Sequence, residues 1–205
     1  MTHSLHRRGN AENLKEDYVI VFIPAKGIND EGHEPKLQEF LRIALRHDPK
    51  NVGAISLGNM YSHKTEEVIK NAHGVAHAVF DSPETLSEVL KEVKEAELGI
   101  STVVSGIFEN VDQCLEKVGL KHHTANFSLG IWGNTKKLPS DDILEITTMC
   151  GHGLISTNLV KAMTKEVKSG TKTPEEAAKA LAPQCACGIF NPARAAKLLA
   201  AMAAK

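Results

Sequence analysis

The chain lacks several features that mark whole classes of protein. Aromatic residues make up only 4% of it, and the charges nearly cancel, leaving a formal net charge of −1. No apolar run approaches the roughly 20 residues that a membrane-spanning helix needs. No part of the chain carries the strongly basic field expected of a nucleic-acid binder. We therefore expect neither a membrane nor a nucleic acid as a partner.

Familiar nucleotide-binding and hydrolase motifs are also missing. There is no Walker A loop, no GxGxxG fingerprint and no GxSxG nucleophile elbow. Hydrophobic residues nonetheless make up 42% of the 205 residues, which is enough for a packed, mainly aliphatic core. The polar N-terminus has no apolar stretch of the signal-peptide type, so we expect a cytoplasmic protein.

Short apolar runs alternate with helical patterns through the first two thirds of the chain. Residues 18–24 read YVIVFIP, which is typical of a buried strand, and apolar residues then recur at helical spacing after Pro35. A second strand is expected over residues 52–57. Together these elements predict one β-α-β unit over residues 18–57.

A second unit of the same kind is expected over residues 100–131. It comprises a strand over 100–105, an amphipathic helix around 111–118 and a strand over 123–131, where polar and apolar residues alternate. Two such units, crossed in the right-handed sense, predict an α/β sandwich of the ferredoxin-like or a related type.

The chain is expected to divide into three parts. Residues 1–16 read as a flexible N-terminal tail, residues 17–133 as the α/β domain and residues 134–205 as a small helical C-terminal part. The β-branched run at residues 143–147 predicts a last strand before these helices. The alanine-rich stretch at residues 195–204 is a strong helix former and offers a surface for packing or homo-oligomer formation.

The most chemically reactive residues fall in two short, glycine-flanked segments of the C-terminal part. One contains Cys150 and His152, and the other contains Cys185 and Cys187. Clustered cysteines in a reducing compartment more often bind metal or perform chemistry than form disulfides. Each segment is expected to precede a helix start, whose N-terminus would lower the thiol pKa.

Three hypotheses follow from these four residues. Together they could hold a zinc ion, or the three cysteines alone could hold an iron–sulfur cluster with one open iron for chemistry on a small polar substrate. Without metal, Cys150 or Cys187 could act as a nucleophile with His152 as its base. In the third hypothesis the cysteines are structural, in a non-catalytic ligand-binding or oligomeric module.

A second candidate ligand site lies in the loop after the first strand. Lys26 and Asn29 follow the strand directly, and open α/β sheets place ligands at the carboxyl ends of strands. These two residues could bind an anionic small molecule there. The other interpretation is a solvated turn, which requires no ligand.

Overall fold

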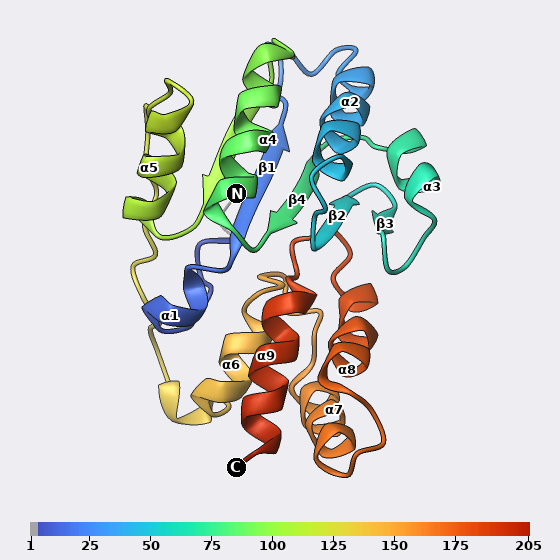
Figure 1. Cartoon of the computed structure of the whole chain (residues 1–205), viewed down its shortest axis with the longest axis vertical. Coiled ribbons are helices and arrows are strands. Elements are labelled where there is room, and N and C mark those ends of the chain that lie inside the picture. Colours follow the sequence, from blue (N-terminus) through green and yellow to red (C-terminus); the bar gives the residue numbers. More distant parts are fainter. Residues whose placement is uncertain (1–3) are drawn as a thin grey trace.

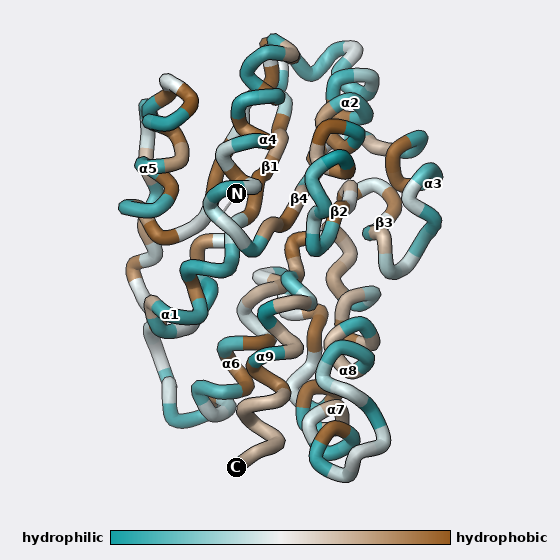
Figure 2. Tube along the Cα trace, in the orientation of Figure 1, coloured by the Kyte–Doolittle hydropathy of each residue, from teal (hydrophilic) through white to brown (hydrophobic). Residues whose placement is uncertain are grey.

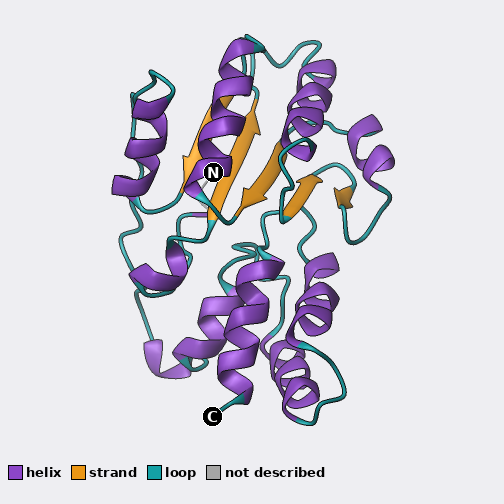
Figure 3. Cartoon of the chain, in the orientation of Figure 1, coloured by secondary structure: helices purple, strands orange, loops and turns teal. Residues whose placement is uncertain are grey.

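The structure is a computed structural model that describes residues 4–205. Strands in this part of the chain are β1 (Tyr18–Ile23), β2 (Asn51–Ala54), β3 (Gly58–Asn59), β4 (Ala76–Phe80) and β5 (Ser101–Ser105). They form a five-stranded sheet in the order β3-β2-β4-β1-β5, and every neighbouring pair is antiparallel (Figure 1, Figure 3). The fold is therefore a mixed α/β fold built on an antiparallel sheet.

The helices fall into two groups around this sheet. Those of the first group are α1 (Ala11–Leu14), α2 (Glu34–Leu45), α3 (Thr65–Lys70), α4 (Pro83–Glu95) and α5 (Phe108–Lys117). The second group comprises α6 (Asp141–Thr147), α7 (Thr157–Lys168), α8 (Pro174–Leu181) and α9 (Pro192–Ala203), with short 3₁₀ turns at Thr135–Lys137 and Ala182–Gln184. Figure 1 shows the second group gathered at one end of the sheet. No helix among the described residues is both long and apolar enough to cross a membrane.

Strand β1 is buried on both faces of the sheet. Its side chains point alternately to the two faces, so they belong to two separate hydrophobic cores. Tyr18, Ile20 and Phe22 pack with the apolar sides of α2 and α4, where the Phe22 ring stacks on Phe40 with 4.7 Å between centroids. Val19 and Val21 belong to the other core, which the C-terminal helices complete. The hydropathy pattern follows this arrangement, with apolar residues concentrated along β1 and β4 (Figure 2).

Each of two helical connections joins a pair of strands that are separated by one other strand in the sheet. β1 and β2, joined through α2, run in the same direction with β4 between them, because both pair antiparallel with β4. β4 and β5, joined through α4, are related in the same way across β1. Residues 18–57 thus contain a strand, a helix and a strand in the expected order, and β4 lies between the two strands in the antiparallel sheet.

Two of the expected strands do not form. Residues 123–131 are irregular coil, so the second β-α-β unit over residues 100–131 is wrong, and positive φ angles of 87° at Gly130 and 89° at Gly133 turn the chain away from an extended path. Residues 143–147 lie in helix α6. Ser140 with two aspartates in the first turn suits a helix start, and the helix buries Ile143, Leu144 and Ile146, of which Ile143 and Ile146 lie three residues apart on one face.

The N-terminal segment packs against the C-terminal helices through a buried polar network. Asp17, which directly precedes β1, accepts hydrogen bonds from both Arg7 and Arg194, and all three side chains are at most 6% exposed. Asn191 donates to the same carboxylate at 3.0 Å. Residues from the segment expected to be a flexible tail therefore help to fix α9 against the start of β1.

Candidate cysteine and histidine site

The structure brings together the cysteines of the two distant segments. Cys150 follows the end of α6, whereas Cys185 and Cys187 lie in the turn between α8 and α9. All three side chains are fully buried as free thiols. Cys185 is the central member, because its thiol lies close enough to those of Cys150 and Cys187 to shift the pKa of both. The three thiols are therefore neighbours across two segments more than thirty residues apart.

Backbone N–H groups near each sulfur lower the pKa of its thiol. These groups belong to His152 and Leu154 for Cys150, to Phe190 for Cys185 and to Ile189 for Cys187. Hydrogen bonds of this kind stabilise the anionic form of an acceptor. The backbone of both turns is therefore arranged to favour negative charge on sulfur.

The three thiols differ in acidity because they share hydrogen bonds. The hydrogen bond with Cys185 and burial raise the pKa of Cys150 well above its usual value. Cys150 in turn lowers the pKa of Cys185, but the hydrogen bond to Cys187 and burial outweigh this, and the pKa of Cys185 rises to about 11. The hydrogen bond from Cys185 lowers the pKa of Cys187. Without a cation, Cys187 is thus the thiol that ionises most readily.

His152 lies at the solvent side of this group. Its Nδ1 is 3.6 Å from the sulfur of Cys187, and the residue as a whole is exposed. The expected helix N-terminus beside Cys150 is absent, since α7 begins only at Thr157. Cys150 follows the C-terminal end of α6 instead, so no helix dipole favours its thiolate.

Buried asparagines of the sheet hold the turn that carries Cys185 and Cys187. Asn59 in β3 donates to the carbonyl oxygens of Ala182 and Cys185 at 3.0 and 2.6 Å. Asn51 in β2 donates to the carbonyl oxygen of Phe190 at 2.9 Å. Both amides are completely buried, so the sheet edge fixes the turn by hydrogen bonds that water does not weaken.

Gly53 allows the same turn to lie directly against β2. A Cβ atom built at Gly53 would lie 2.6 Å from the carbonyl oxygen of Cys187 and 2.8 Å from the Cα of Gly188. We expect Gly53→Ala to lower the free energy of unfolding by about 1–3 kcal/mol, because backbone on both sides must move apart. Urea denaturation measures this effect, and an unchanged stability would show that the turn is not tightly held.

Arg7 contacts the backbone of both cysteine segments. Its guanidinium donates to the carbonyl oxygen of Met149, at 3.2 Å, and to that of Ile189. These carbonyls flank Cys150 on one side of the site and Cys187 on the other. Arg7 therefore links the two segments at the same time as it pairs with Asp17.

The structure does not bring Lys26 and Asn29 to this site. They lie in the loop that follows the C-terminal end of β1, whereas α6, α7, α8 and α9, between which the cysteine segments fall in the sequence, are gathered at the opposite end of the sheet (Figure 1). The Asn29 side chain accepts from the N–H of Ala25 at 2.6 Å and donates to the carbonyl oxygen of Gly99 at 2.7 Å. Lys26 is exposed. Asn29 is therefore used to close its own loop, and binding of an anion there stays a prediction.

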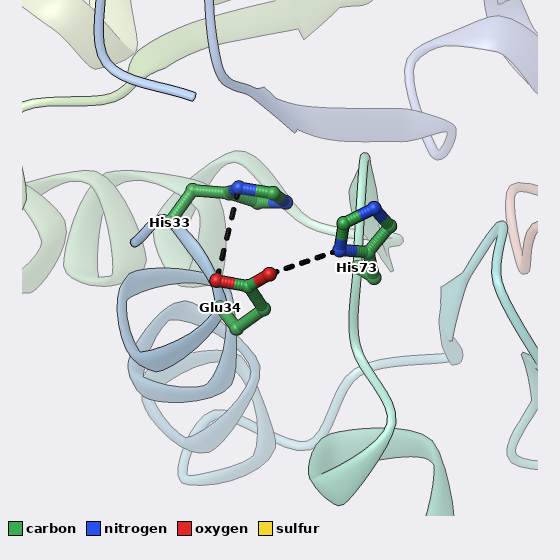
Figure 4. Close-up of side chains that lie close together, drawn as sticks. All are labelled: His33, Glu34 and His73. Atoms are coloured by element: carbon green, nitrogen blue, oxygen red, sulfur yellow. Dashed lines mark hydrogen bonds and ion pairs between the residues drawn. The ribbon is translucent and has the colours of Figure 1, made fainter. Parts of the chain in front are cut away.

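One further group of ligand-type side chains lies close together. Among the described residues, ligand atoms of His33, Glu34 and His73 all lie within 4.8 Å of one another (Figure 4). Nε2 of the buried His33 accepts the N–H of Gly74 at 2.9 Å, so its Nδ1 carries the proton and donates to the carbonyl oxygen of Asp30. Both ring nitrogens are thus occupied. We interpret His33 as a structural histidine beside an exposed Glu34–His73 pair.

Comparisons with known proteins give no information about the chemistry of the site. No protein-family model matches the chain, and neither the curated proteins nor the solved structures include a match. The residues that support the site, Asp17, Arg194 and Asn59, were not singled out from the sequence as its partners. Arg194 carried one usable signal, because an arginine in the first turn of an apolar helix opposes the helix dipole and needs an acidic partner.

Proposed function

We propose that this protein binds a zinc ion or an iron–sulfur cluster through Cys150, Cys185 and Cys187, with His152 as the fourth ligand or as an acid/base group beside the metal. The observation that carries the proposal is the group of three buried thiols, in which Cys185 lies beside Cys150 and Cys187, with His152 at 3.6 Å from the sulfur of Cys187. Thiolate and imidazole are the common ligands of zinc, and thiolate is the common ligand of iron–sulfur clusters.

Electrostatics favours a cation at this position. Three sulfurs packed together away from water cannot all ionise by themselves, which is why the pKa values of Cys150 and Cys185 are raised. A bound metal cation reverses this balance and deprotonates its thiol ligands. The backbone N–H groups aimed at the sulfurs would then stabilise the thiolates that the metal requires.

The distances constrain how the metal would be held. Zinc–ligand bonds of about 2.0 and 2.3 Å at a tetrahedral angle place nitrogen and sulfur roughly 3.5 Å apart. The 3.6 Å contact between His152 and Cys187 agrees with that value. The three cysteine sulfurs are not all within 4.8 Å of one another in the described structure, so a single zinc ion requires Cys150 or Cys187 to draw inward. An iron–sulfur cluster, whose cysteines bind separate irons, accepts a wider spacing.

The two metal centres imply different activities. A zinc ion with all four ligands would be closed and structural. A cluster held by the three cysteines would keep one open iron as a Lewis acid for a small polar substrate, and the exposed His152 could then move a proton at its edge. The second arrangement makes the protein an enzyme or an enzyme subunit.

Anaerobic purification followed by metal analysis and a visible spectrum tests the proposal. We expect either about one zinc per chain without colour, or several irons and acid-labile sulfide per chain with a broad brown absorption. A colourless protein that contains neither metal, and that takes up neither on reconstitution, would refute the proposal.

A metal-free thiol enzyme is the second candidate, and one observation favours it. The contact between Cys187 and His152 places a nucleophile beside a base, with Cys185 as a neighbouring thiol. Of the two cysteines considered as the nucleophile, Cys150 and Cys187, this contact favours Cys187. Rapid alkylation of Cys187 at neutral pH in metal-free protein, lost in His152→Ala, would support it over the metal site.

We also propose a ferredoxin-like core, a cytoplasmic location and a homo-oligomer, as the sequence suggested. The strand order β5-β1-β4-β2 with two crossovers supports a ferredoxin-like core, to which β3 and the helical part are additions. Four free cysteines and no disulfide among the described residues agree with a cytoplasmic location. The alanine-rich helix α9 offers a surface for a homo-oligomer. A non-catalytic oligomeric module, the third hypothesis, would use this surface of α9.

A further inference from the structure

The outer edge of the sheet borders a large cavity that is separate from the cysteine site. The cavity has a volume of about 680 Å³, and none of Cys150, His152, Cys185 and Cys187 lines it. It lies between β5, α4, α5 and residues 120–128. Protein cores are packed closely enough that a void of this size is not a packing defect, and small-molecule sites commonly measure 300–1,000 Å³.

The strand beside this cavity is incompletely covered. Every residue of β2, β3 and β4 is buried, whereas Ser101 and Thr102 of β5 are exposed and the rest of that strand is half-buried. α5 packs against α4 at the side of the sheet (Figure 1). The space that a helix would fill over β5 is therefore part of the cavity.

The walls of the cavity are aliphatic and part of its lining is aromatic. Its apolar lining comes from Val93 in α4, Val104 in β5 and Leu115 in α5. The rings of Phe108 and Phe127, which also line it, lie 4.8 Å apart and are both partly exposed, at 37% and 67%. A phenylalanine pair left open to solvent at an apolar cavity is suited to covering a bound hydrocarbon or aromatic group.

Several polar and charged groups of the lining already have partners. Asp112 and His122 share a hydrogen bond of 2.7 Å, Lys94 donates to the carbonyl oxygen of Val118 at 2.8 Å, and Arg7 pairs with Asp17. A charged ligand would have to displace these contacts. Ser101 and Thr102 also line the cavity, as do Glu97, Lys121 and His123. The apolar walls therefore favour an uncharged molecule, and polar groups at the rim are free to contact water.

We propose that this cavity is a binding site for a neutral, predominantly apolar small molecule, seated between β5 and α5 beneath Phe108 and Phe127. The site is independent of the cysteine site, so either could exist without the other. Residues 123–128 would then serve as part of its wall, which gives the exposed side chain of Phe127 a role.

Binding of the neutral, environment-sensitive dye N-phenyl-1-naphthylamine tests the proposal on the full chain. We expect saturable binding of one dye per chain, with enhanced fluorescence. Thr102→Trp should weaken this binding at least tenfold, because an indole at this exposed strand position enters the cavity while suiting a strand. Ile28→Trp is the matched control, since the Ile28 side chain is 83% exposed and does not line the cavity.

The location of the dye is checked by methyl NMR. Saturating dye should shift the methyl signals of Val93, Val104 and Leu115 and leave those of Val160 and Leu199, in the C-terminal core, unchanged. Circular dichroism confirms that both tryptophan variants fold. Non-saturable binding, or equal affinity in Thr102→Trp and Ile28→Trp, would overturn the proposal. So would light scattering showing a dimer that the dye dissociates, because the cavity would then be occupied by a second copy.

Discussion

Asp17→Asn is expected to lower the free energy of unfolding by about 3–5 kcal/mol, which is the usual cost of breaking a buried ion pair by removing one partner. The Asp17 carboxylate is fully buried and accepts from Arg7, Arg194 and Asn191. The amide keeps the shape but removes the only formal negative charge that these two guanidiniums share in the described structure. Their Nε atoms already lie buried without a hydrogen-bond partner there, so no spare contact offsets the loss.

Urea denaturation of the purified variants measures this difference. Asp141→Asn is the control, because Asp141 also pairs with an arginine, Arg8, but is 76% exposed. Its cost should stay below about 1 kcal/mol. If Asp17→Asn and Asp141→Asn were equally stable, the buried network would not be what holds α9 to β1.

The sequence predicted the core elements well because they depend on local patterns. The continuous apolar run that forms β1 and the proline and capping residues at the starts of α4, α8 and α9 are short-range signals. Strand pairing was not predicted, because no local pattern in residues 51–54 indicates that β4 rather than β1 is the neighbouring strand. The strand predicted over residues 143–147 was wrong for another reason. Its β-branched residues are typical of a strand, but the aspartates that precede them favour a helix start.

The candidate site was predicted in composition but not in its supporting contacts. The glycine-flanked turns around Cys150 and Cys187 were visible as motifs, and in the structure their thiols are buried close enough to shift one another's pKa values. Asn59 and Gly53 were not predicted as supports, because their role depends on the sheet edge that they share with the turn. Burial of the cysteines was one of the alternatives open from the sequence, and it results from packing of β1 against the C-terminal helices.

Cys185→Ala is expected to reduce bound metal to less than a tenth of the wild-type content. Cys185 contacts both other cysteines, so its loss removes the central ligand of the group. Metal per chain, measured after anaerobic purification, reports the effect. Cys114→Ala is the matched control, because Cys114 is an equally buried thiol that lies in α5 and hydrogen-bonds to the carbonyl oxygen of Pro83. It should retain the full metal content.

His152→Ala separates the two kinds of metal centre. A zinc ion would lose its fourth ligand, and its affinity should fall at least tenfold. A cluster bound by the three cysteines alone should remain in place with an unchanged iron content. If Cys185→Ala and Cys114→Ala bound equal amounts of metal, any metal present would lie elsewhere in the chain.

X-ray absorption at the edge of the metal found in the wild-type protein gives the most direct view of its ligands. A site built from Cys150, Cys185 and Cys187 should give a first shell dominated by sulfur at about 2.3 Å. That sulfur shell should disappear in Cys185→Ala and persist in Cys114→Ala. A shell of oxygen and nitrogen alone in the wild-type protein would show that these cysteines are not the metal ligands.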